Sequence, residues 1–138
     1  MSINYEFLYA FSKELLKLDK TITWIGIANN FGVLLNVEHR EELLPLLTEE
    51  ENEEYVSSTI TRHKTRIKFE SRIGKLIYAL GKYQKLNRVT IPINENYYLL
   101  IALDTEVKDF DNTIMEKIIP LIKKEKHNFG NSNTIEHK

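Results

Sequence analysis

The chain has 138 residues, 42% of them hydrophobic and 28% charged, with a formal net charge of −1. This length and composition are those of one globular domain, and we expect neither a membrane span nor a signal peptide. The sequence has no cysteine, which excludes disulfides, thiol catalysis and thiolate metal sites and fits a cytoplasmic protein.

The first part of the chain predicts a helix followed by a β-hairpin. Residues 22–29 are mostly apolar and predict a strand, and residues 33–37 predict its hairpin partner. Asn and Gly within residues 29–32 favour the turn between them, because both tolerate positive φ. Before the hairpin, residues 3–18 predict an amphipathic helix, because its apolar residues are three or four positions apart: Phe7, Phe11, Leu15 and Leu18.

A long helix is predicted in the middle of the chain. Residues 38–47 form a connector, after which Thr48 is a good N-cap and Glu51 completes a capping box. The helix is expected to run to about Glu70, and Gly74 follows its stop. Its predicted buried stripe consists of Val56, Ile60, His63 and Ile67.

Three further strands are predicted over residues 75–83, 88–93 and 97–103. The last is almost entirely apolar, which is typical of a central strand covered on both faces. In the first of them, one face is predicted to hold Leu76, Tyr78 and Leu80. The short connections predict an α+β fold, in which a five-stranded antiparallel sheet has the long helix on one face and the two outer helices on the other.

The C-terminal part predicts an acidic loop and a last helix. Asp111 is expected to cap a helix over residues 112–124, and Pro120 is expected to kink or divide it. We expect one domain over residues 1–126, and residues 127–138 are polar and predict a disordered tail.

This order of elements resembles the roadblock domain, a small α/β fold related to longin and profilin-like domains, over about residues 3–124. Short segments also resemble a group of small archaeal proteins without an established activity: Trp24-Ile25-Gly26-Ile27, Asn30-Phe31-Gly32, Leu46-Leu47-Thr48-Glu49-Glu50-Glu51 and Tyr78-Ala79-Leu80. The resemblance to roadblock domains implies homodimerisation and the docking of small GTPases or larger scaffold proteins. It implies no catalytic residues and no cofactor.

Charge is segregated along the middle of the chain. Residues 38–54 hold eight acidic residues and one basic residue, a net charge of −7, whereas residues 62–88 hold nine basic residues and one acidic residue, a net charge of +8. The helix dipole needs only one or two carboxylates at a helix start, and like charges four residues apart repel. Three interpretations stay open: a solvated face, antiparallel pairing of two copies, or a charged external partner.

The dimer interpretation places the interface on the long helix, residues 49–70, and on the strand 75–83. The connector is a candidate partner surface, because its leucines are more apolar than a linker requires. The candidate interface residues are therefore Glu50, Glu51, Glu54, Arg62, Arg66, Leu43, Leu44 and Lys82.

No motif in the sequence assigns an enzymatic reaction. Gly81-Lys82 is followed by tyrosine rather than by the Ser or Thr of a phosphate-binding loop. The histidines are far apart in the sequence and give no metal-ligand spacing: His39, His63, His127 and His137. We therefore expect a non-enzymatic adaptor or regulator without a cofactor or metal site.

Two other functional classes stay open. Trp24 is interpreted as a core residue, but the alternative is that it lines a small-molecule pocket between the sheet and the helices, as in a sensor domain. The basic segment, residues 62–88, is an alternative site for nucleic acid or another polyanion, because it contains the aromatic residues Phe69, Tyr78 and Tyr83. The nearly neutral net charge argues against this last class.

Overall fold

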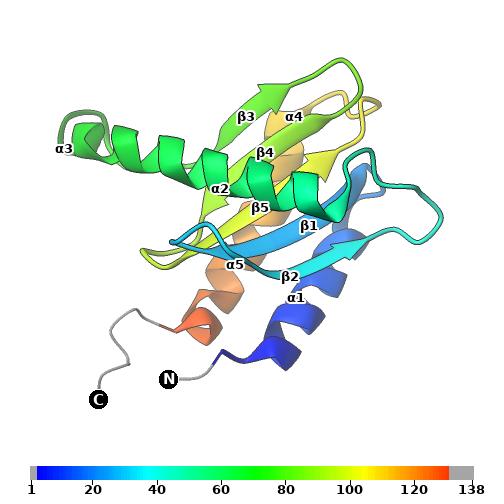
Figure 1. Ribbon diagram of the computed structural model, residues 1–138, viewed down its shortest axis with the longest axis horizontal. Helices are drawn as coiled ribbons and strands as arrows, with labels where there is room; N and C mark the ends of the chain where they lie inside the picture. The colour runs from blue at the N-terminus through cyan, green and yellow to red at the C-terminus, as the bar shows by residue number, and fades with distance from the viewer. Residues whose placement is uncertain (1–2, 131–138) are drawn as a thin grey trace.

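The computed structural model describes residues 3–130 and contains a five-stranded sheet with helices on both faces (Figure 1). The strands are β1 (Ile22–Asn29), β2 (Leu34–His39), β3 (Ala79–Lys82), β4 (Asn87–Pro92) and β5 (Tyr97–Leu103). The α-helices are α1 (Tyr5–Leu18), α2 (Glu49–Arg66), α3 (Glu70–Ile73), α4 (Phe110–Asn112) and α5 (Ile119–Glu125). Shorter helical segments are the 3-10 turns Ile67–Phe69 and Lys126–Phe129 and the π-helical segment Thr113–Ile118.

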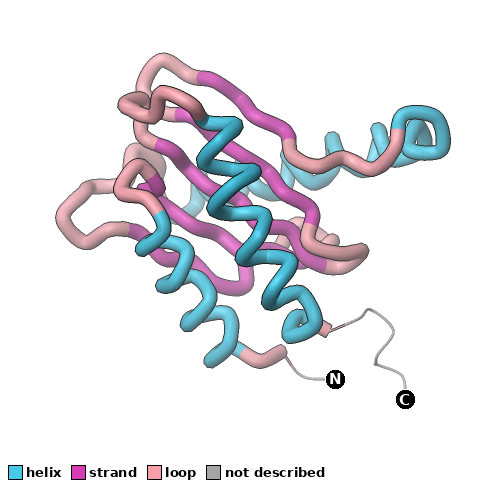
Figure 2. The backbone as a smooth tube through the Cα atoms, turned by 180° about the vertical axis from the view of Figure 1, so that it is seen from behind, coloured by secondary structure: helices cyan, strands magenta, loops and turns pink. Residues whose placement is uncertain are grey.

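The strand order is β2-β1-β5-β4-β3, and every neighbouring pair is antiparallel. α2 crosses one face of the sheet (Figure 1), whereas α1 and the helix that ends in α5 lie side by side on the other face (Figure 2). This arrangement confirms the predicted fold class, including the position of the long helix opposite the two outer helices.

The two central strands, β1 and β5, contribute to two separate cores. Beneath α1 and α5, the core is built from large aliphatic side chains such as Ile25, Ile27 and Ile101. The core beneath α2 is smaller and consists of Trp24, Ala28, Val56, Ile60, Tyr98, Leu100 and Ala102. Burial on both faces confirms the prediction of a covered central strand over residues 97–103.

Local hydrogen bonds account for the hairpin turn and for the start of α2, as predicted. The side-chain oxygen of Asn29 accepts hydrogen bonds from two backbone amides of the turn, and Gly32 has a φ of +83°. Thr48 Oγ1 accepts from the amide of Glu51 at 3.1 Å, and Glu51 Oε1 accepts from the amide of Thr48 at 2.9 Å. The capping box is therefore complete.

The end of α2 differs from the prediction. The helix ends at Arg66, continues through a 3-10 turn into α3, and stops at Gly74, which has a φ of +87°. This end projects beyond the sheet (Figure 1), so Ile67, predicted to be buried, is 47% exposed. The predicted strand over residues 75–83 is confined to Ala79–Lys82, because the preceding residues lead back from the projecting end to the sheet.

The start of the last helix also differs from the prediction. Asp109, rather than Asp111, is the N-cap, since its Oδ1 accepts from the amide of Asn112 at 3.0 Å. Asp111 instead accepts a hydrogen bond from the Tyr78 hydroxyl. Pro120 cannot donate a backbone hydrogen bond, and a π-helical segment precedes it, so the helix continues through the proline without dividing.

The packed chain extends beyond the predicted domain boundary. Phe129 is buried, and its ring lies 4.9 Å from the ring of Phe7 and 5.1 Å from that of Phe11. The prediction of a disordered tail is therefore wrong for residues 127–130. Residues 131–138, the rest of the predicted tail, lie outside the described residues.

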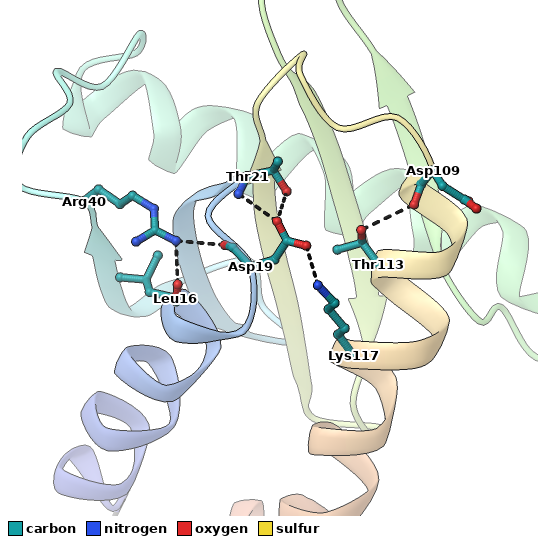
Figure 3. A network of polar contacts seen from close by, with 7 residues as sticks. All are labelled: Leu16, Asp19, Thr21, Arg40, Asp109, Thr113 and Lys117. Atoms are coloured by element: carbon teal, nitrogen blue, oxygen red, sulfur yellow. Dashed lines mark hydrogen bonds and ion pairs between the residues drawn. The ribbon is translucent and has the colours of Figure 1, made fainter.

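A polar network joins three segments at one end of the sheet (Figure 3). The Asp19 carboxylate accepts hydrogen bonds from the amide and hydroxyl of Thr21 and, at 2.8 Å, from Lys117 Nζ. Arg40 donates to the carbonyl oxygens of Leu16 and Asp19. This network ties the chain after β2 and the last helix to the end of α1.

Gly26 is required because Trp24 packs over it. A Cβ atom on Gly26 would lie 2.4 Å from Cη2 of Trp24, whose indole is buried beneath α2. Gly26→Ala is therefore expected to lower the free energy of unfolding by about 1–3 kcal/mol in urea denaturation. Gly81→Ala is the matched control, because its Cβ would lie 3.3 Å from the exposed ring of Tyr83, which has to shift by only a few tenths of an ångström. Equal losses in the two variants would contradict this explanation.

Asp19 makes stability depend on acid pH. Burial raises its pKa, but the hydrogen bonds from Lys117 and Thr21 outweigh burial and lower the pKa to about 2 from 3.8. The ionised carboxylate thus stabilises the fold above about pH 4, and this contribution is lost as the pH falls toward 2. Asp19→Asn is expected to cost about 1–2 kcal/mol at pH 7 and to flatten the pH dependence between 4 and 2.

The test of Asp19 is urea denaturation of both proteins at pH 7, 4 and 2.5. Glu14→Gln, a neutralisation on the exposed side of α1, should keep the wild-type pH dependence. The same acid sensitivity in Asp19→Asn as in the wild type would rule out this role of the carboxylate.

Candidate functional site

The outer face of α2 presents the charged residues that were predicted at the interface. Glu50, Glu51 and Glu54 are exposed near its start, and Arg62 and Arg66 are exposed near its end. None of the ion pairs among residues 3–130 involves α2. The structure therefore brings both charge clusters to one helix and leaves them unneutralised by the same chain. The opposite face is buried through Asn52, Val56, Ile60 and His63.

Small hydroxyl residues separate the two charged ends of this face. Ser57, Ser58, Thr61 and Thr65 are exposed. At 3.6 residues per turn, they lie on the side of the helix opposite the buried stripe. Small side chains allow another helix to approach closely, since the distance between packed helices depends on the side chains at the contact.

The projecting end of α2 and the sheet edge beside it expose apolar groups. Ile73 is 83% exposed, and Ile67, Phe69 and Ile77 are also exposed. β3 is an edge strand with β4 as its neighbour in the sheet, and Lys82, a predicted interface residue, is exposed at its end. Exposed apolar side chains and a sheet edge are each typical of interaction surfaces.

The connector between β2 and α2, residues 40–48, exposes the other predicted partner residues. Leu44 is 93% exposed, and Leu43 is also exposed. Hydrogen bonds from Arg40 hold the start of the connector, and the capping box at Thr48 holds its end. The leucines therefore lie on a short arch between two fixed points.

A pocket of about 180 Å³ lies beneath this arch. It is lined by the connector and by residues of all the sheet's inner strands and of α2: Thr23, Trp24, His39, Leu43, Leu44, Pro45, Leu46, Leu47, Asn52, Lys85, Leu86, Arg88, Ala102 and Asp104. Trp24 is buried in the core beneath α2, as interpreted, and it also lines the pocket, whereas a small-molecule sensor role for it stays a prediction.

Arg88 was predicted only as a member of the basic segment 62–88, and the sequence did not indicate that it lines a pocket. It is only 6% exposed, and its guanidinium carbon lies 4.2 Å from the centre of the Tyr55 ring and 4.8 Å from that of Trp24. Nη1 donates to Asn52 Oδ1 at 3.1 Å, whereas Nη2 has no hydrogen-bond partner among residues 3–130. Burial lowers the pKa of Arg88, but a guanidinium stays charged at neutral pH.

Strand register makes room for this cation. Arg88 lies opposite Ala102 on β5 and opposite Gly81 on β3. The small side chain of Ala102 leaves space for the guanidinium beneath α2, whereas a Cβ atom on Gly81 would meet the ring of Tyr83. One feature of the sequence could have indicated a buried cation here. Arg88 directly precedes a β-branched run that begins at Val89, and both lie within the predicted strand over residues 88–93.

The basic segment does not form one surface. Arg88 is buried, Arg62 and Lys64 are exposed on α2, and Lys85 lines the pocket. Tyr78, one of its aromatic residues, is half-buried and hydrogen-bonded to Asp111. Binding of a polyanion stays a prediction.

Over residues 3–130, no three histidine or acidic side chains are arranged to hold a metal ion. Over the same range, no helix has the length and hydropathy needed to cross a bilayer.

His63 lies against Tyr98, with ring centres 5.3 Å apart, and burial lowers its pKa, so it is a neutral core residue at pH 7.

No protein-family model and no curated protein matches this sequence. Solved structures are similar in fold. The gliding protein MglB from Thermus thermophilus has a TM-score of 0.68 at 9% identity, over 91% of this chain and 87% of that one. A roadblock/LC7 domain from Streptomyces avermitilis also has a TM-score of 0.68 at 9% identity, over 88% and 97% of the two chains. MglB in a tetrameric arrangement has a TM-score of 0.61 at 9% identity, over 93% and 85%. The chain therefore has a roadblock/LC7-like fold.

Proposed function

We propose that this chain is a non-enzymatic adaptor or regulator domain that acts as a homodimer. The observation that carries the proposal is the outer face of α2, which is acidic at one end, basic at the other and lined by small residues between them. The fold supports it, because the resemblance to roadblock domains implies homodimerisation. One similar structure, MglB, has a tetrameric arrangement.

If two copies of α2 packed antiparallel about a two-fold axis at Ser58, the acidic residues of each helix would lie beside the basic residues of the other. Glu50 and Arg66 are each eight residues from Ser58, and Glu54 and Arg62 are each four residues from it. Glu50 would then face Arg66 of the other copy, and Glu54 would face Arg62 of the other copy. The two-fold axis repeats each contact, as an isologous interface requires. The repulsion within each acidic end would be offset by the partner copy.

The same pairing accounts for the projecting end of α2. In an antiparallel pair, each projecting end extends over the other copy. The exposed side chains of Ile67, Phe69 and Ile73 would then be covered, which gains the free energy of apolar burial.

A single introduced cysteine tests this axis, because the chain has no cysteine of its own. In Ser58→Cys, two thiols at the axis would be close enough to form a disulfide, and we expect a cross-linked dimer on a non-reducing gel after mild oxidation. Thr65→Cys is the matched control on the same exposed face. It lies seven residues from the axis, so at about 1.5 Å per residue the two thiols would be roughly 20 Å apart.

Charge reversal tests what holds the pair together. In the Ser58→Cys background, Arg62→Glu with Arg66→Glu should reduce cross-linking, and adding Glu50→Arg with Glu54→Arg should restore it. Raised salt should also weaken the wild-type dimer. Equal cross-linking at positions 58 and 65, or a monomer in light scattering at micromolar concentration, would overturn the proposed dimer.

We further propose that the connector binds a partner protein, a small GTPase or a scaffold, as the resemblance to roadblock domains implies. The proposal is supported by the exposure of Leu43 and Leu44 on a segment held at both ends.

We expect this interaction in the cytoplasm. The resemblance to small archaeal proteins stays a prediction.

A pull-down from nuclease-treated cell extract, with and without a GTP analogue, tests the partner. The tagged wild-type chain should recover a small GTPase preferentially with the analogue, as identified by mass spectrometry. Leu43→Asp with Leu44→Asp should lose it, because charged side chains replace the apolar contact. Recovery of only the chain itself would contradict a GTPase partner and favour the sensor alternative.

A further inference from the structure

The guanidinium of Arg88 is a buried cation without a counter-ion in the described part of the chain. One of its two terminal nitrogens donates to Asn52, and the other has no partner. The rings of Trp24 and Tyr55 stabilise the charge through their faces, but they do not accept the in-plane N–H groups as an oxygen would. A buried charge of this kind is normally paired, because its desolvation is otherwise uncompensated.

Arg88 lines the pocket beneath the connector, although its Nη2 atom is itself covered from solvent. Arg88 and Asn52 line this pocket together with Thr23, and a second cation, Lys85, also lines it and is exposed to solvent. The carboxylate of Asp104 lines the pocket as well, and its Oδ1 accepts a hydrogen bond from the amide of Glu106 at 2.7 Å. The polar end of the pocket therefore holds two cations and one acidic residue, Asp104, and the buried cation, Arg88, has no ion-pair partner within residues 3–130.

The remaining wall of the pocket is apolar. The connector contributes five consecutive apolar residues to it: Leu43, Leu44, Pro45, Leu46 and Leu47. The acidic side chains of the neighbouring helix start, such as Glu49 and Glu50, are exposed to solvent, where salt screens their effect on the pocket. A concave apolar site with a few convergent polar groups is the usual form of a small-molecule site.

We propose that this pocket binds a small amphipathic carboxylate, whose carboxylate group pairs with Arg88 and whose apolar body lies against the connector leucines. A carboxylate provides two acceptor oxygens in the plane that a guanidinium fork recognises. This binding site is separate from the outer face of α2, so it does not depend on the dimer proposed above.

Octanoate is a suitable probe, because it combines one carboxylate with a flexible apolar chain. Its dissociation constant for the full chain is measured by calorimetry and by amide chemical-shift changes around the pocket. Octan-1-ol, with the same chain length and no charge, should bind at least about tenfold more weakly, since it cannot form the charge-assisted pair. Butanoate should also bind more weakly, because it buries less apolar surface.

Two variants address the role of Arg88. Arg88→Met keeps the apolar stem and removes the charge, and it should weaken octanoate binding at least about tenfold. Asn52→Asp places a carboxylate where Asn52 Oδ1 now lies, 3.1 Å from Arg88 Nη1. This internal counter-ion should abolish octanoate binding while the fold is kept, so the proposal stays testable even if Arg88→Met does not fold. Lys124→Met, which removes an exposed cation from α5 on the other face of the sheet, is the control and should bind as the wild type does.

The outcomes separate clearly. Saturable octanoate binding that is lost in Asn52→Asp and kept in Lys124→Met supports the proposal. Absence of saturable binding by the folded wild type overturns it for this class of ligand. Equal affinity of octanoate and octan-1-ol, or unchanged affinity in Asn52→Asp, would also overturn it, because the site would then be only an apolar cavity. A monomeric protein that still binds octanoate would contradict the dimer without contradicting this site.

Discussion

Burial of β1 and β5 on both faces is the constraint on which the rest of the structure depends. Side chains alternate between the two faces of a strand, so each of these strands must fit two cores at once. The large aliphatic residues, such as Ile25 and Ile101, point to the two outer helices. The face beneath α2 combines the small residues Ala28 and Ala102 with the larger Trp24, Tyr98 and Leu100. The chain therefore has one deep core and one shallow core.

The shallow core explains why both candidate sites involve α2. Protein interiors are normally close-packed, which leaves no space for an unpaired cation. Here Ala102 and Gly81 flank Arg88 in the sheet, and the connector arches over the site without filling it. The inner face of α2 therefore borders a pocket, while its outer face is left with charges that no ion pair within residues 3–130 neutralises. One helix separates a proposed ligand site from a proposed assembly surface.

Local and periodic signals predicted the fold well, whereas features set by distant segments were missed. The capping box at Thr48 depends on residues three positions apart, so sequence alone identifies it. Ile67 continues the helical stripe, but no sheet lies beneath it. Asp111 is an acceptable cap by residue type, yet it is held by Tyr78, which comes from far along the chain. The setting of Arg88 depends on the register of three strands, which no local pattern encodes.

The connector has an outer side with exposed leucines and an inner side that lines the pocket, and both sides belong to the same five residues, 43–47. If a molecule bound below favours an arch conformation that an outer partner binds better or worse, it changes the free energy of binding from above. Thermodynamic linkage makes such a coupling reciprocal, so a partner bound outside would change the affinity of the pocket by the same factor. The shared arch would thus let a metabolite concentration set the occupancy of a protein complex without any movement of the sheet.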